Sequence, residues 1–406
     1  MNKFVSFLII AILSLSIGLF FILRKTNADN EVIFWTLQMS DFAPYINGVI
    51  NDFEKENPDI KIKWVDVPFS EGEKRTLASV LSDNPPDLVN LNPDFSSTLA
   101  HKGALLEIEK SELEQFHPEI LKSLEVNGKY YSIPWYATSS ITIYNKDLIS
   151  KSGIKLPQTY KDIEQNAKTV KNKTGAYITL PNITENDTML KILNKYGCTV
   201  SNLKMNKCTE VFEMFKNMYS KNLIPKETVT VTLQEALEKY MSENIALIGA
   251  GANFLNMIKE NAPATYSKTN VAPQIKGELG QNDFSLMNFV IPLKAKHKEQ
   301  ALKFALYLTN DKNQLDLAKL TNVIAVNSKT LQNKFYTSYE NDDLMAKARV
   351  ISASQLNHLK PVFRTQRGQK DINNIINTAV QNILLNKGKT EDILDKTAKN
   401  LSKIEK

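Results

Sequence analysis

Hydrophobic positions along the chain follow two spacings, one typical of strands and one typical of helices. Residues 31–37 contain a short apolar run that predicts a buried strand. Residues 42–57 carry apolar side chains at helical spacing, and residues 60–67 alternate between apolar and polar positions as a second strand. The chain therefore opens as strand, helix, strand, which is the repeating unit of a parallel sheet.

The same two patterns continue towards the C-terminus without an internal repeat. They predict further strands over residues 87–91, 139–145, 176–180, 245–248 and 285–291. They predict further helices over residues 71–81, 95–106, 160–171, 188–196, 210–220, 233–241, 297–308, 371–385 and 390–404. Because 406 residues are too many for one ordinary core, we expect an α/β protein with two domains.

Residues 128–147, which read GKYYSIPWYATSSITIYNKD, join two different patterns. Residues 130–136 mix aromatic and polar side chains around Pro134, which lacks a backbone donor and disfavours a regular sheet interior. Residues 139–145 then alternate as a strand. An aromatic step leading into a strand predicts a crossing between two domains, with aromatic rings near the gap between them. An ordinary loop with buried aromatic side chains is the alternative.

An uncharged apolar segment, residues 4–23, lies near the N-terminus, with a lysine before it and an Arg-Lys pair after it. A helix of this length can span a bilayer core. Residues 1–28 are therefore either a signal peptide or an uncleaved membrane anchor, and the length of the run favours the anchor. The basic pair argues against export because positive charge prefers the cytoplasm. Length and the soluble character of residues 29–406 still lead us to expect export.

Charge limits the classes of partner that the protein can have. The net charge is +6, but residues 1–28 contain three of the 50 basic residues and none of the 44 acidic ones. The remaining 47 basic and 44 acidic residues nearly balance, which argues against a nucleic-acid partner. With 23% charged and 42% hydrophobic residues, we expect residues 29–406 to form a soluble, globular monomer.

Cys198 and Cys208 are the only cysteines. In an exported protein we expect them to form a disulfide that closes a short loop, and two free thiols are the alternative. The chain has no CxxC motif, and its four histidines lack metal-ligand spacing, so we expect no metal and no other cofactor. No nucleophile elbow, HExxH motif or Cys/His pairing is present, so we expect no enzymatic activity. Abundant carboxylates keep a glycoside-hydrolysing pair open as an alternative.

Five segments, which lie in order between residues 34 and 314, carry a resemblance to a known family. They read FWTLQMSDFAPYINGVINDFEKENPDIKIKWVDVPF, PPDLVNLNPDFSSTLAHKGALLEI, NGKYYSIPWYATSSITIYNKDLISKSGIKLPQTYKDI, EALEKYMSENIALIGAGANF and FSLMNFVIPLKAKHKEQALKFALYLTNDKNQ. In this series the chain resembles the extracellular solute-binding proteins of bacterial sugar ABC transporters, the group that includes maltodextrin-binding protein. It departs from the family at residues 251–253, where a Gly-Pro-Trp step is common, and in lacking the lipid-anchor cysteine.

The resemblance implies a two-lobed periplasmic-binding-protein fold, α/β in both lobes and preceded by an N-terminal hydrophobic helix. Lobe 1 is expected to contain residues 29–137 and 287–328. Lobe 2 is expected to contain residues 138–286 and 329–406, including the C-terminal helices. Segments that cross between the lobes would form a hinge, so that the lobes close on a ligand.

The resemblance also implies a function. The protein is expected to capture a sugar or oligosaccharide between its lobes and to deliver it to the permease subunits of an ABC importer. Its expected location is periplasmic or extracytoplasmic, and residues 4–23 would supply any membrane tether. A binding protein that reports to a membrane sensor and an exported carbohydrate-active enzyme are the alternatives.

The family's ligand contacts fall on loops that follow strands and on the first crossing. Aromatic rings there can stack on sugar C–H faces, while amides and carboxylates pair with hydroxyls. A phosphate or amino-acid ligand would instead need an arginine clamp, which these positions lack. The expected ligand-binding residues are Trp35, Gln38, Asp41, Asn92, Asp94, Trp135, Tyr136, Asn253 and Phe254. Asp94 and Trp135 are the strongest candidates. A place in the core is the alternative for Trp35 and Phe254, and a helix cap is the alternative for Asp41.

Overall fold

The computed structural model of the chain describes residues 31–37, 39–321, 323–340, 342–358 and 368–404. The predictions of a signal peptide or membrane anchor within residues 1–28 lie outside the described residues. Within the described part, no helix is long and apolar enough to cross a membrane.

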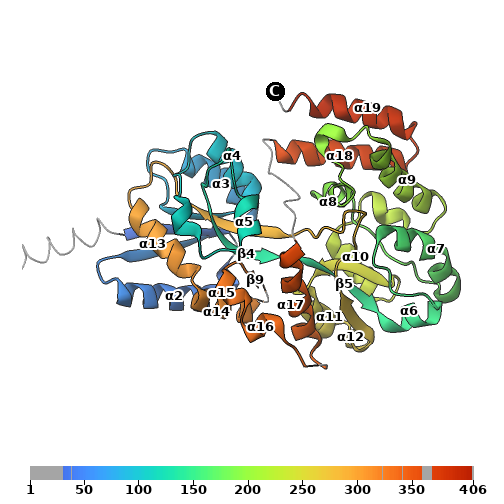
Figure 1. Cartoon of the computed structure of the whole chain (residues 1–406), viewed down its shortest axis with the longest axis horizontal. Helices are drawn as coiled ribbons and strands as arrows, with labels where there is room; N and C mark the ends of the chain where they lie inside the picture. The colour runs from blue at the N-terminus through green and yellow to red at the C-terminus, as the bar shows by residue number, and fades with distance from the viewer. Residues whose placement is uncertain (1–30, 38, 322, 341, 359–367, 405–406) are drawn as a thin grey trace, which may run out of the picture.

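Two separate sheets divide the molecule into two lobes (Figure 1). The strands of the first sheet are β1 (Glu31–Leu37), β2 (Lys61–Val67), β3 (Leu88–Leu91), β4 (Ile133–Thr138), β8 (Ser285–Val290) and β9 (Ile324–Ala325). Those of the second sheet are β5 (Ser140–Asn145), β6 (Leu247–Gly251) and β7 (Thr269–Ala272). The strand orders are β2-β1-β3-β8-β4-β9 and β6-β5-β7. We call the part built on the six-stranded sheet lobe 1 and the part built on the three-stranded sheet lobe 2.

Helices surround each sheet, with lobe 1 on the left and lobe 2 on the right of Figure 1. The helices of lobe 1 are α2 (Ala43–Glu56), α3 (Phe69–Val80), α4 (Pro93–His101), α5 (Pro118–Ser123), α13 (Lys298–Leu308), α14 (Asp311–Thr321), α15 (Ser328–Leu331) and α16 (Lys334–Thr337). Those of lobe 2 are α6 (Lys146–Ser152), α7 (Tyr160–Thr174), α8 (Thr188–Asn194), α9 (Asn206–Ser220), α10 (Leu233–Met241), α11 (Phe254–Asn261), α12 (Pro263–Lys268), α18 (Gln369–Leu384) and α19 (Thr390–Leu401). Helix α17 (Leu344–Ser354) lies where the lobes meet.

Lobe 1 begins with the expected strand–helix–strand unit. Strands β1 and β2 are parallel, with Glu31 opposite Lys61, and β1 also runs parallel to β3. On the buried face of β1, Phe34 packs edge-on against Phe304 of α13, with ring centres 5.4 Å apart. Phe304 also packs against Phe53 of α2. This aromatic cluster holds α2 and α13 on the sheet.

Lobe 2 combines a small antiparallel sheet with a large helical core. Strand β5 lies between β6 and β7. Helix α9 buries Phe212 and Phe215 in the same hydrophobic cluster as Ile376 of α18. A disulfide between Cys198 and Cys208, whose Cα atoms are 5.7 Å apart, joins the turn after α8 to the first turn of α9. This is the pairing that the sequence led us to expect.

Within the described residues, three segments connect the lobes. The first is the step from β4 to β5 at Ser139, and the second is residues 273–284, between β7 and β8. The third includes α17, in which Ala348 packs in the core of lobe 2 and Ala353 in the core of lobe 1. The lobes are therefore joined by three crossings that lie far apart in the sequence.

The expected lobe boundaries need correction at each crossing. Thr138 of β4 pairs with Ser285 of β8 in the sheet of lobe 1, so both residues belong to lobe 1 and not to lobe 2. Tyr336 of α16 is buried in the core of lobe 1, so this lobe continues past residue 328. The reason is that the short helices after β9 bury their apolar side chains against lobe 1.

Pro134 lies inside the six-stranded sheet, where a regular interior position was not expected. Strand β4 runs between β8 and β9, but β9 pairs with it only at Tyr136 and Ala137, beyond the proline. The register between β4 and β8 also shifts between Pro134 and Tyr136. A bulge of this kind accommodates a residue that has no N–H group.

Candidate ligand-binding site

A cavity of about 650 Å³ lies between the two lobes and extends into lobe 2. Its lobe 1 wall includes Tyr136 of β4 and Phe284, just before β8. Its lobe 2 wall includes Phe254 at the start of α11 and reaches Phe215 of α9. This volume falls within the range of about 300–1,000 Å³ that is typical of small-molecule sites.

Aromatic rings from both lobes line the cavity. Lobe 1 supplies Phe42, Tyr136 and Phe284, and lobe 2 supplies Tyr160, Phe215 and Phe254. Burial raises the pKa of the Tyr136 hydroxyl to about 12, so this group stays protonated at neutral pH and can donate a hydrogen bond. Rings of this kind offer flat apolar surfaces with polar edges.

Helix α8 presents a polar stripe to the cavity. Lys191 and Lys195 are four residues apart, which places them on one face of the helix, and both line the cavity. Met189 and Leu193 of α8 are buried in the core of lobe 2. The disulfide begins at Cys198, four residues after the end of α8, and so restrains the turn that follows Lys195.

Lys195 and Asp283 form a buried ion pair in the cavity wall. The Lys195 ammonium lies 2.9 Å from Asp283 Oδ2, and its side chain is only 3% exposed. It also donates to Gln274 Oε1 at 2.6 Å and to the Ile275 carbonyl at 2.9 Å. Burial acts to raise the pKa of the Asp283 carboxyl, but Lys195, Lys191 and hydrogen bonds outweigh it and hold this pKa below its usual value. The carboxyl group is therefore ionised at neutral pH.

Lys191 reaches from lobe 2 to lobe 1. Its ammonium lies 3.1 Å from Asp187 Oδ2 in lobe 2 and 3.3 Å from Ser285 Oγ in lobe 1. Burial acts to lower the pKa of Lys191, but Asp187, Asp283 and Asp94 outweigh it and raise this pKa. The side chain is therefore a permanent cation between the lobes.

The three crossings are hydrogen-bonded to one another beside the cavity. Gln355, which follows α17, donates from Nε2 to Ser139 Oγ at 2.7 Å. Its Oε1 accepts from the Gln274 backbone N–H at 2.8 Å, and its carbonyl accepts from Asn282 Nδ2 at 3.1 Å. Ser139 and Gln274 line the cavity. The buried Gln355 thus joins the third crossing to the other two. It also supports Ser139 and Gln274, which we call the polar floor of the cavity.

Three of the residues expected to bind ligand line the cavity: Tyr136, Asn253 and Phe254. Trp135 does not. Its side chain is 0% exposed and stacks on Phe289 in the core of lobe 1, with ring centres 4.6 Å apart. A ring with no accessible face cannot stack on a ligand, so the expectation for Trp135 is corrected here.

Trp35, Asn92 and Asp94 are not part of the cavity lining that the described residues form. The Arg75 guanidinium lies over the half-buried Trp35 ring, 5.2 Å from its centre. Asn92 caps α4 by accepting from the Phe95 N–H at 2.8 Å. Asp94, in the first turn of α4, acts electrostatically on Lys191 and helps to raise the pKa of that side chain.

Two of the expected residues, Gln38 and Asp41, are not fully described by the structure. Gln38 lies outside the described residues, as does the side chain of Asp41. The backbone of Asp41 belongs to a short 3₁₀ helix, η1 (Ser40–Phe42), and the N-cap of α2 is Phe42. Asp41 is therefore not the cap that its position before the predicted helix suggested.

Four polar residues of the cavity lining were missed by the sequence analysis: Lys191, Lys195, Gln274 and Asp283. The spacing of Lys191 and Lys195 on a predicted helix could have indicated a shared face. Gln274 and Asp283 lie in a crossing without periodic pattern, so no local signal marks them. Their role depends on contacts with residues far away in the sequence.

Known bacterial binding proteins resemble this chain over most of its length. The family model "Bacterial extracellular solute-binding protein" matches residues 48–346. The multiple sugar-binding protein of Streptococcus mutans is 25% identical over 310 residues, covering 70% of this chain and 72% of that protein. The diacetylchitobiose binding protein DasA of Streptomyces coelicolor is 27% identical over 346 residues, covering 76% of this chain and 77% of that protein.

Solved structures share the fold. The sugar-binding protein MalE of Xanthomonas citri superimposes with a TM-score of 0.79 at 19% identity, covering 92% of this chain and 97% of that one. An ABC substrate-binding protein of Listeria monocytogenes in complex with cycloalternan gives a TM-score of 0.71 at 20% identity, covering 92% and 98%. Since the family model spans well over half of its length, the chain belongs to the bacterial extracellular solute-binding proteins.

Proposed function

We propose that this protein captures an uncharged sugar or oligosaccharide in the cavity between its lobes and delivers it to the permease subunits of an ABC importer. The observation that carries the proposal is the cavity itself, which combines aromatic rings from both lobes with a polar floor made by the crossings. The rings suit the C–H faces of a sugar, and the floor suits its hydroxyls.

Charge balance supports an uncharged ligand. Lys195 is neutralised by Asp283, and Lys191 by Asp187. A phosphate or carboxylate ligand would need an excess of positive charge, which these pairs do not leave. Relatives named for the ligands diacetylchitobiose, maltodextrin, galactooligosaccharide and mannitol point to the same chemical class.

Capture would work by closure of the lobes. A ligand that touches both walls binds the closed arrangement better than an open one, and so shifts the equilibrium between them. The closed form would then be the state that a permease recognises on the outer side of the membrane. Family members are binding proteins, and the proposal includes no catalytic step.

The test is a thermal-shift screen of the purified protein against maltose, maltotriose, N,N′-diacetylchitobiose, a galactooligosaccharide and mannitol, with glucuronic acid and glucose 6-phosphate as charged comparisons. A ligand present at about 100 times its dissociation constant adds roughly 2.7 kcal/mol of stability. We expect at least one uncharged sugar to raise the melting temperature, with calorimetry confirming one site per chain. A shift only with the charged compounds would contradict the proposal.

A further inference from the structure

We propose that Asp283 and Lys191 form the polar anchor of the cavity and bind two adjacent hydroxyl groups of the sugar. Asp283 accepts a hydrogen bond from one hydroxyl, and Lys191 donates one to the oxygen of its neighbour. This inference rests on the proposed function and deepens it by assigning two residues and the chemical group that they recognise, a vicinal diol.

Lys195 is excluded as a ligand donor by its existing contacts. An ammonium group has three N–H donors. Asp283, Gln274 and the Ile275 carbonyl take all three, at 2.6–2.9 Å. Lys195 therefore acts as a positioning residue that fixes the Asp283 carboxylate.

Asp283 retains acceptor capacity. A carboxylate offers about four lone-pair sites on its two oxygens. Within the described part of the chain, the side-chain contacts of this carboxylate are Lys195 at 2.9 Å and Ser140 Oγ at 3.4 Å. Asp283 is the only acidic side chain in the lining that the described residues form. A charged acceptor thus remains available to a hydroxyl in the cavity.

Lys191 retains one donor. Two of its three N–H groups face Asp187 Oδ2 at 3.1 Å and Ser285 Oγ at 3.3 Å. Asp187 lies four residues earlier in the chain, next to α8, and holds the ammonium at the cavity from the side of lobe 2. The third N–H group has no acceptor among the described residues and is available to a ligand oxygen.

The Asp283 carboxylate and the Lys191 ammonium are close enough to interact electrostatically, yet no hydrogen bond joins them in the described structure. A vicinal diol can bridge such a pair because each hydroxyl both donates and accepts. An anionic group would be repelled by Asp283, and an amine by Lys191. The arrangement therefore selects an uncharged polyhydroxy ligand.

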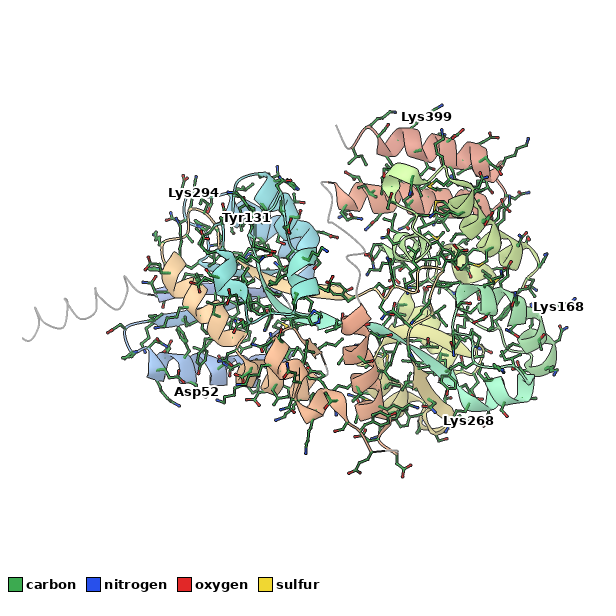
Figure 2. All side chains as sticks on the ribbon, viewed as in Figure 1. Asp52, Tyr131, Lys168, Lys268, Lys294 and Lys399 are labelled. Atoms are coloured by element: carbon green, nitrogen blue, oxygen red, sulfur yellow. A yellow bond between two sulfur atoms is a disulfide. The ribbon has the colours of Figure 1, made fainter. Side chains whose placement is uncertain are left out.

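The test measures sugar affinity by calorimetry for the full chain and for Asp283→Asn, Lys191→Met and the double variant, with the five uncharged sugars named above as probes. Matched controls are Asp395→Asn and Lys204→Met, which break an exposed ion pair of 2.9 Å in the same lobe. Asp395 belongs to α19, on the outer side of lobe 2, where Figure 2 labels Lys399. Lys191→Arg is the conservative variant, because a guanidinium also donates.

We expect each single cavity variant to bind roughly 10- to 100-fold more weakly, as loss of a hydrogen bond to a charged group does. The double variant should lose less than the product of the two factors, because both residues hold one diol. The controls should stay within two-fold of the unchanged chain, and Lys191→Arg should restore most of the affinity. If Asp283→Asn also lowers the melting temperature, the affinity of Lys191→Met tests the proposal instead. The Lys191 side chain is 27% exposed, so its removal leaves the core intact.

Two failures are distinguishable. If the unchanged chain binds a probe sugar while Asp283→Asn and Lys191→Met bind it equally well, the diol anchor is overturned and the proposed function stands. If the unchanged chain binds none of the five probes, both proposals fall.

Discussion

Replacing Trp135 with alanine separates a core role of this side chain from a ligand-binding role. The indole is 0% exposed and stacks on Phe289. The carbonyl of Trp135 also accepts a hydrogen bond from the buried Gln314 side chain. Since the ring fills space inside lobe 1, its removal should reduce stability whether or not a sugar is present.

The expected loss of stability follows from the cavity that the indole leaves behind. Truncating a fully buried tryptophan costs about 3–5 kcal/mol. At about 2–4 °C per kcal/mol for a unit of some 150–250 residues, the melting temperature should fall by roughly 10 °C. Trp135→Phe should cost much less, because it keeps a ring against Phe289 and removes an indole N–H that has no acceptor among the described residues.

The assay is urea and thermal denaturation of Trp135→Ala and Trp135→Phe, together with sugar affinity measured well below the melting point. Trp35→Ala serves as the control, because its ring is only partly buried. We expect the order of destabilisation to be Trp135→Ala, then Trp35→Ala, then Trp135→Phe, with affinities close to that of the unchanged chain. A ten-fold loss of affinity in Trp135→Ala without a change in melting temperature would refute the core assignment.

Four further predictions follow from the contacts described above. Reducing the Cys198–Cys208 disulfide should lower stability by roughly 2–3 kcal/mol, measured by urea denaturation with and without reductant. The pKa of Asp283 is lower in the folded chain than its ordinary value, so its stabilising contribution should be complete above about pH 4 and vanish as the pH falls through the folded value. A plot of the stability difference between the unchanged chain and Asp283→Asn against pH checks this sign. Gly277→Ala should destabilise, because its Cβ would lie 2.6 Å from the Lys195 carbonyl oxygen, whereas Gly48→Ala, with open space around it inside α2, should stabilise slightly; thermal melts compare the two. Residues 29–406 alone should elute as a monomer without detergent, and a need for detergent would contradict the expected soluble body.

Long periodic elements were predictable because their pattern repeats several times. The helix expected over residues 42–57 is α2 (Ala43–Glu56), and the strand expected over residues 31–37 is β1. Short or irregular elements were not. Strand β9 has two residues, and residues 176–180 form only an isolated bridge, Tyr177 to Ile245, in place of the expected strand. Such elements depend on what lies beside them, which a local pattern does not record.

The neighbours Trp135 and Tyr136 show why the site was only partly predictable. Successive side chains of a strand point to opposite faces, so only one of these two rings could face the cavity. The sequence identifies both as aromatic residues at a crossing but does not say which face of β4 the core of lobe 1 covers. The structure places Trp135 against Phe289 and leaves Tyr136 in the cavity wall.

The floor of the cavity could not be predicted for a different reason. Ser139, Gln274 and Gln355 belong to three crossings that meet only in the folded chain. The alternating pattern that begins at Ser139 does not indicate that its side chain meets the other two. Buried polar groups need partners, so each of these side chains is stable only when the other two crossings are in place. The same contacts that join the lobes therefore also shape the surface that faces the ligand. In the proposed mechanism, a change of hinge angle would move Ser139 and Gln274 relative to the cavity walls and would so couple ligand contact to lobe closure.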